Sequence, residues 1–140
     1  MRRRIVLALL VSIASVGTLF SQEEERSPPV SSQDVAILER AKELLPDEAH
    51  WNRRDDRNCL PDAKVLSLFC ALQKASIEKL GTYDHRRAAL QEVRFAIEEV
   101  SKGREFEHRL MDFNNLPETH LADIQRVLDI ALTRVRARLH

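Results

Sequence analysis

The sequence contains few of the residues that build β-structure and its turns. Among 140 residues there are only three glycines and five prolines, and aromatic residues make up 5% of the chain. Valine and isoleucine do not gather in the alternating runs that half-buried strands require. A β-sandwich or β-barrel also needs many tight turns. Both architectures are therefore excluded, and we expect an all-α fold.

The overall composition is that of one folded domain. Charged residues account for 31% of the chain and apolar residues for 44%, with 22 basic and 22 acidic residues. Without Arg2, Arg3 and Arg4, the rest of the chain holds 19 basic and 22 acidic residues, a net charge of −3. Nucleic-acid binding depends on neutralising phosphates with Lys and Arg, so we expect no nucleic-acid partner.

The first 21 residues follow the order of a secretory signal peptide. Three arginines precede an apolar run from Ile5 to Phe20, and the sequence turns acidic after Gln22. This pattern predicts a signal peptide over residues 1–21 and export to the periplasm or the extracellular space. A membrane-spanning helix needs about 20 apolar residues, so a retained anchor formed by residues 5–20 is the alternative.

The rest of the chain divides into a leader and one domain. Residues 22–33 are polar, and with a single apolar residue they cannot bury a face, so they are expected to be a disordered leader. Residues 34–140 form the expected helical domain. Apolar residues recur there at helical spacing, and a small four-helix bundle follows from the helices expected at about 33–45, 62–80, 84–101 and 118–138.

The boundaries of the second helix follow from its flanking residues. Asp62 is a candidate N-cap, and Gly81 suits the left-handed residue that often closes a helix.

Two connections between the expected helices lack helical periodicity. Residues 47–61 contain the only tryptophan, Trp51, in a loop long enough to be functional. Residues 104–117 form either a short helix or an extended segment laid over the core.

The leading functional hypothesis is a non-enzymatic module that binds a protein or an envelope component. The candidate binding residues come from the Trp51 loop and the turn before the last helix: Trp51, Asp55, Asp56, Phe113, Asn114, Asn115 and His120. The alternative is a hydrolase in which Asp55 or Asp56 converges with His50 and His120 in one pocket. Asparagines before a helix more often satisfy backbone groups, which is the structural interpretation of this turn.

Motifs for other chemistry are missing. The sequence has no G-x-S-x-G, no Gly-rich phosphate loop and no H-E-x-x-H. A di-metal site in a bundle uses paired Glu-x-x-His motifs, and only Glu105 with His108 fits. Two cysteines are too few for a structural zinc site without histidine ligands. We therefore expect no metal and no cofactor.

The two cysteines, Cys59 and Cys70, form the expected disulfide of an exported protein. Closing the intervening loop would stabilise the fold by roughly 3 kcal/mol. Cys70 lies about two turns inside the expected second helix, so the loop must fold back to bring the Cα atoms within roughly 7 Å. The alternative is a buried Cys70 and a free Cys59 thiol.

Several short motifs together resemble a family of small bacterial and phage helical domains of unknown function. They are a first helix and loop ending at Trp51, the Cys70-Ala71-Leu72 helix, and the Phe113-Asn114-Asn115 turn before Thr119-His120. The resemblance extends over roughly residues 34–138. It implies a helical fold and carries no mechanism, because the family has no assigned activity.

Overall fold

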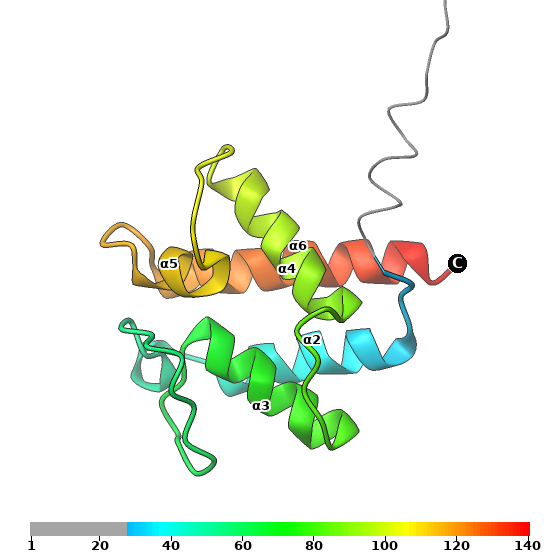
Figure 1. Cartoon of the computed structure of the whole chain (residues 1–140), viewed down its shortest axis with the longest axis horizontal. Helices are drawn as coiled ribbons and strands as arrows, with labels where there is room; N and C mark the ends of the chain where they lie inside the picture. The colour runs from blue at the N-terminus through cyan, green and yellow to red at the C-terminus, as the bar shows by residue number, and fades with distance from the viewer. Residues whose placement is uncertain (1–27) are drawn as a thin grey trace, which may run out of the picture.

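The computed structural model describes residues 28–140, so the expected signal peptide and residues 22–27 of the leader lie outside the described residues. Within residues 28–140 the fold is all-helical, as the composition predicts, with five α-helices, one 3-10 turn and no strand. The elements are α2 (Ser32–Leu44), η1 (Glu48–His50), α3 (Leu68–Leu80), α4 (Ala88–Val100), α5 (Arg109–Asn115) and α6 (Leu121–Arg138) (Figure 1).

Helix α2 begins inside the range expected for the leader. Ser31 caps it in a reciprocal capping box, in which the Ser31 backbone N–H and hydroxyl donate to the Asp34 carboxylate at 2.8 and 2.9 Å. Val30, just before the cap, packs against the core. The end of the leader is therefore part of the helical domain.

The expected start of the second helix at Asp62 is wrong. Helix α3 begins at Leu68, and the Ser67 hydroxyl caps it by accepting a hydrogen bond from the Cys70 N–H at 3.1 Å. The residues before it form a turn and a bend instead, and Leu66 forms an isolated parallel β-bridge with Trp51. The other end is confirmed, since Gly81 closes the helix with a φ of 76°.

The remaining boundaries also differ by a few residues. Helix α4 begins at Ala88 rather than near residue 84, because Asp84 closes a turn by accepting from the Arg86 N–H at 2.9 Å. Helix α6 begins at Leu121 rather than near residue 118, because His120 and Asp123 form its capping box. Of the two possibilities for residues 104–117, the short helix is found, as α5.

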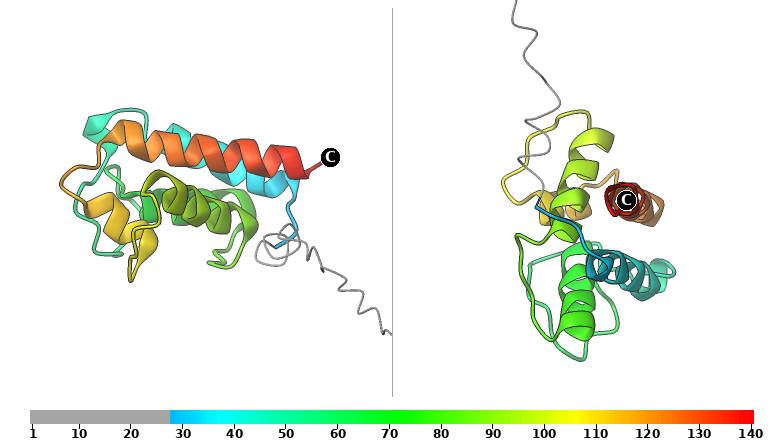
Figure 2. Two further views of the ribbon diagram at one scale, coloured as in Figure 1. Left: turned by 90° about the horizontal axis from the view of Figure 1, so that it is seen from above. Right: turned by 90° about the vertical axis from the view of Figure 1, so that its right-hand side faces the viewer.

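Helices α2 and α6 lie side by side and antiparallel (Figures 1 and 2). Glu39 pairs with Arg136 at 2.6 Å, and the Leu45 carbonyl accepts from Gln125 at 3.2 Å at the opposite end. Helix α4 packs on α6, and α3 packs on α2. Together they enclose fully buried apolar side chains: Ile37, Leu38, Leu68, Leu72, Leu90, Val93, Ile97, Ile124, Val127, Leu128 and Val135.

A buried carboxylate joins two of these helices. Asp34, which is 1% exposed, accepts from the Ala89 N–H at 3.1 Å in the first turn of α4 and pairs with Arg87 at 3.1 Å. A negative charge there suits the positive end of the helix dipole.

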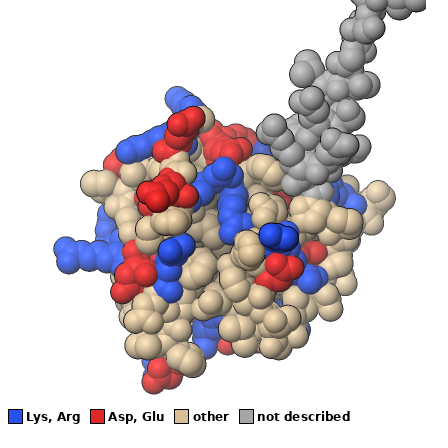
Figure 3. All heavy atoms as spheres, viewed as in Figure 1, with Lys and Arg blue, Asp and Glu red and all other residues tan. Residues whose placement is uncertain are grey.

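On the face shown in Figure 3, acidic and basic side chains are interspersed. Among residues 28–140, no helix combines the length and hydropathy that crossing a membrane requires.

Candidate functional site

Residues 45–67, between α2 and α3, carry three of the seven candidate binding residues, Trp51, Asp55 and Asp56, and we call this segment the Trp51 loop. The loop folds against α5 and the start of α3. Its backbone pairs with itself near the base, where the Asn52 N–H donates to the Leu66 carbonyl at 2.9 Å and the Leu66 N–H donates to the His50 carbonyl at 2.8 Å. The two ends of the loop are thereby held together.

Asn114 on α5 connects the loop to two helices. Its Oδ1 accepts from the Trp51 indole N–H at 2.8 Å and from the Leu68 N–H at 3.0 Å, while its Nδ2 donates to the Asn52 carbonyl at 2.9 Å. Asn114 is 1% exposed and Trp51 is 3% exposed. The pair is therefore a buried polar connection, which is the structural interpretation of the asparagine turn.

The neighbouring Asn115 fixes the next part of the loop through backbone contacts. Its Oδ1 accepts from the Asp55 N–H at 2.7 Å, and its Nδ2 donates to the Asp55 carbonyl at 2.8 Å. Arg53 lies over the Trp51 ring with 4.8 Å to the centroid and donates to the Thr119 carbonyl at 3.1 Å. Two adjacent asparagines and one arginine therefore position the loop against α5 and the start of α6.

Asp55 is a buried carboxyl at the centre of the loop, 6% exposed. Its Oδ1 accepts from the Arg57 N–H at 2.7 Å, and its Oδ2 is buried with no hydrogen-bond partner within ordinary distance and angle limits. Burial raises the pKa of Asp55, and the Arg57 amide and the Ser67 hydroxyl oppose that rise. The charged form is thus destabilised in the folded protein.

The Cys59–Cys70 disulfide is present, with 5.3 Å between the Cα atoms. The expected geometric obstacle disappears because α3 begins later than predicted. Cys70 therefore lies in the first turn of the helix rather than two turns inside it. The bond ties the outer part of the Trp51 loop to α3.

The candidate binding residues do not form one exposed surface. Trp51, Asp55, Phe113 and Asn114 are buried, and a direct contact between them and a partner stays a prediction. Asp56 and His120 are exposed, and Asn115 is exposed with its amide engaged by the Asp55 backbone. A sequence pattern identified these residues as a group, and the structure places most of them in the support of the loop.

The residues proposed for hydrolysis have separate local partners. His50 contacts Asp47 at 2.6 Å, and this hydrogen bond lowers the pKa of Asp47. His120 caps α6, and its backbone N–H donates to the Asp123 carboxylate at 2.9 Å. Neither histidine lines a described cavity or contacts Asp55. Among residues 28–140, no group of three or more His, Cys, Asp or Glu residues is arranged to hold a metal ion.

The outer side of the Trp51 loop borders an apolar cavity of about 150 Å³ beside the disulfide. We call three residues that line it, Leu60, Pro61 and Ile77, the apolar loop face. Leu60 is 58% exposed and Ile77 is 48% exposed. Lys74 and Glu78, 3.5 Å apart, lie at the same cavity and give it a charged rim. No local sequence pattern marks this face, because its residues come from both the loop and α3.

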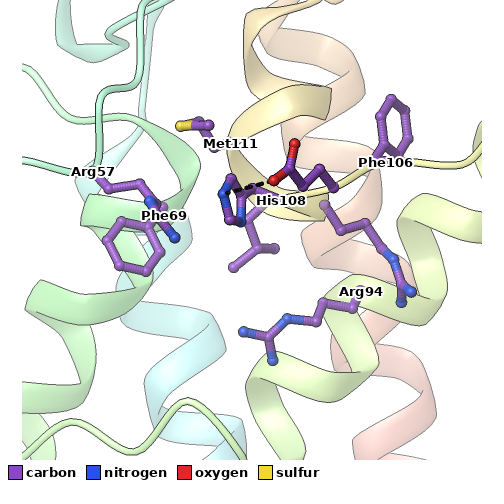
Figure 4. A pocket seen from close by; sticks show the side chains of 9 residues that line it. Arg57, Phe69, Arg94, Phe106, His108 and Met111 are labelled. Carbon is purple, nitrogen blue, oxygen red and sulfur yellow. Dashed lines mark ion pairs between the residues drawn. The ribbon is translucent and has the colours of Figure 1, made fainter.

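A second cavity of about 240 Å³ lies on another side of the loop, and we call it the cationic cavity. Figure 4 shows Arg57 and Phe69 on one side of it, with Arg94 and Phe106 contributed by other segments. Arg109 also lines the cavity. These residues are spread over more than 50 positions of the chain, so no local sequence signal marks them.

The fold and the loop define a small helical domain whose longest connection is closed by a disulfide. A family model matches residues 30–134, and the chain belongs to that family, which is described as a family of unknown function (DUF6197). The match runs from just before α2 into the last turns of α6 and so includes the Trp51 loop. No curated protein and no solved structure matches the chain.

Proposed function

We propose that this protein is an exported, non-enzymatic module that binds another protein through the apolar loop face. The observation that carries the proposal is the exposure of Leu60 and Ile77, about half of each side chain, on a loop and helix joined by a disulfide. Contiguous apolar side chains held in water are typical of interaction surfaces. The cavity between them offers a recess for an apolar side chain of the partner.

The supports of the loop favour binding because they fix its conformation in advance. Asn114 and Asn115 hold the base of the loop, and the disulfide holds its outer part. A preorganised surface loses less conformational entropy on association than a flexible one. In this proposal the buried Trp51 and the asparagine pair act on the partner indirectly, by positioning Leu60.

The rim of the apolar loop face has the polar character of an interface margin. Glu78 pairs with Arg40 at 2.6 Å as well as with Lys74, and Lys74 also donates to the Pro61 carbonyl at 3.2 Å. Interfaces commonly combine an apolar centre with a charged rim that sets orientation. A protein partner with an apolar side chain flanked by charged groups fits this arrangement.

Export is supported by the signal-like N-terminus and by the disulfide, since disulfides persist mainly in oxidising compartments. Mass spectrometry of the protein isolated from its source cells tests this part. We expect a mature N-terminus near Thr18 or Gln22 in a periplasmic or extracellular fraction. Recovery of the intact chain from the cytosol, with free thiols, would contradict export.

The binding proposal is tested with the double variant Leu60→Ser, Ile77→Ser. Leu139→Ser is the matched control, because Leu139 is also an exposed apolar residue, 40% exposed, at the end of α6. A partner crosslinked in the envelope fraction would be purified and titrated by calorimetry. We expect about tenfold or greater loss of affinity for the double variant and none for the control. Equal affinities for all three proteins would refute the proposed face.

A further inference from the structure

We propose that the cationic cavity is a binding site for a small organic monocarboxylate, one that carries an aromatic ring or a short apolar chain. The site is separate from the apolar loop face and uses different residues. Four parts of the chain contribute to it: the Trp51 loop, α3, α4 and the segment from Phe106 through the first turn of α5. A ligand there would contact several elements that the sequence alone does not bring together.

Arg94 differs from the other partly buried arginines in its hydrogen-bond partners. Residues 28–140 contain five: Arg40, Arg87, Arg94, Arg109 and Arg134. Four of them pair with a carboxylate within 3.1 Å, whereas Arg94 donates to the His85 carbonyl at 2.7 Å and hydrogen-bonds the Tyr83 hydroxyl. Partly buried charges are normally neutralised by a partner. The guanidinium of Arg94 therefore lies at the wall of a cavity without a carboxylate partner.

The electrostatics of this group agree with its geometry. Burial lowers the pKa of Arg94, the neighbouring Tyr83 opposes that fall, and the positive charge of Arg109 adds to it. Arg109 faces the same cavity but already pairs with Glu98 at 2.8 Å. One arginine is thus matched and the other is not. An anion with a single charge would neutralise Arg94 without leaving an excess of negative charge in the cavity.

Arg57 adds a second positive group at the exposed side of the cavity. Its backbone has a φ of 60°, in the left-handed region that residues other than glycine seldom adopt, and the Asp55 carboxylate accepts its N–H. Glu107 is the acidic residue of the cavity lining, 89% exposed in its side chain and 4.0 Å from His108. Figure 4 shows this ion pair beside the cavity.

The remaining walls of the cavity are apolar. Phe69, Phe106, Leu110 and Met111 line it, and Phe69 is held edge-on against the Tyr83 ring with 6.0 Å between centroids. An aromatic ring or short chain would contact these side chains while its carboxylate meets Arg94, whose planar guanidinium suits bidentate pairing. The volume of about 240 Å³ is below that of pockets for drug-sized molecules, so the ligand is small.

The test uses the purified, disulfide-bonded protein and three related probes: benzoate, neutral benzyl alcohol and cationic benzylamine. Amide shifts of Phe69, Arg94 and Leu110 are followed by NMR during each titration. We expect saturable shifts with benzoate at a Kd of about 1 mM or below, and binding of the other two probes weaker by about tenfold or more. Absence of saturable shifts with benzoate, or equal binding of benzyl alcohol, would overturn the proposal.

Three variants assign the binding to this cavity. Arg94→Gln should weaken benzoate binding by about tenfold or more, since it removes a charge-assisted pair. Arg57→Gln, at an exposed position, should weaken it by about threefold. Arg126→Gln is the matched control, because Arg126 is exposed on α6 and lines neither cavity, and it should bind as the wild type does.

Circular dichroism establishes that each variant is folded. A folded Arg94→Gln protein that binds benzoate like the wild type would overturn the site, as would an equal loss in Arg126→Gln. If Arg94→Gln does not fold, Arg57→Gln decides the question, and unchanged binding by that variant counts against the proposal. None of these measurements involves Leu60 or Ile77, so their outcome is independent of the protein-binding function proposed above.

Discussion

The helical bundle and the Trp51 loop are stabilised by different kinds of interaction. In the bundle, apolar side chains from four helices are fully buried against one another, and the stabilisation is shared among many of them. In the loop, Trp51, Leu66 and Leu45 are the buried apolar side chains, and the conformation depends on two asparagines and one disulfide. The same chain therefore has a region of distributed stability beside a region held at a few points.

This difference predicts how the stability of each region responds to substitutions. Loss of one apolar contact in the bundle weakens the whole domain, because all helices share the core. Loss of one connection in the loop allows local opening while the bundle remains folded. The free energy of global unfolding therefore reports on the whole domain, whereas hydrogen exchange of the loop amides reports on local opening. Substitutions in the two regions should change these two quantities to different extents.

The largest effect is expected in the bundle. Leu128→Ala, at a position with no exposed surface on α6, should lower the free energy of unfolding by about 4 kcal/mol through lost burial and the cavity left behind. Urea denaturation followed by circular dichroism measures this, and Leu139→Ala, at an exposed position, should change it by less than about 0.5 kcal/mol. Similar effects of both substitutions would break the distinction between core and surface.

The disulfide is expected to have the next largest effect. Cys59→Ala with Cys70→Ala should lower the free energy of unfolding by about 3 kcal/mol, because the open loop gains conformational entropy in the unfolded chain. Amides of residues 56–66 should exchange faster than those of α6. A reductant should destabilise the wild type and leave the variant unchanged. The α6 amides also exchange faster when global stability falls, so an equal acceleration in the loop and in α6 would show that the loop and bundle open as one unit.

Asn114→Ala tests the polar support of the loop. It leaves the Trp51 indole and the Leu68 N–H without their acceptor, so the free energy of unfolding should fall by about 2 kcal/mol. Trp51 fluorescence should shift to longer wavelength as the loop opens to water. Asn58→Ala, at an exposed loop position, is the control and should leave both quantities unchanged. A buried, unshifted Trp51 in Asn114→Ala would show that the disulfide alone holds the loop.

The same contrast explains what the sequence could predict. Periodic apolar residues identified the four long helices, because burial against a shared core depends on spacing along one element. The N-terminal boundaries of three helices were misplaced, because capping and pairing compete with helix propensity there. Asp62 and Ser67 are both acceptable N-caps, and the bridge between Leu66 and Trp51 decides in favour of Ser67.

The loop was harder to predict because its contacts join distant residues. Trp51 and Asn114 are 63 positions apart, and nothing in either segment specifies the other. The sequence did single out both residues, but their burial could not be read from composition. Leu60, Ile77 and Arg94 gave no signal, since an exposed leucine or an unpaired arginine is recognised only when its neighbours in space are known. The disulfide was predicted from export and cysteine number, not from geometry.

The smallest expected effect comes from Asp55, where the loop contains a buried carboxyl rather than an apolar contact. Burial raises its pKa in the folded protein, so protonation favours folding. The contribution of Asp55 to stability is fully favourable below the unfolded pKa of about 4 and is lost as pH rises through the higher folded value. At neutral pH the charged carboxylate should therefore destabilise the loop.

Asp55→Asn removes this charge and keeps an oxygen that can accept from the Arg57 N–H. Its free energy of unfolding should exceed that of the wild type by about 1 kcal/mol at pH 7, and the difference should shrink as pH falls towards 4. Asp56→Asn, at the exposed neighbour, should show no such dependence. A difference that stays constant would mean that folding does not raise the pKa of Asp55, and one that grows on acidification would mean that the Asp55 charge stabilises the loop. Asp55 would then belong with Asn114 and the disulfide among the supports that hold Arg57 and Leu60 in place.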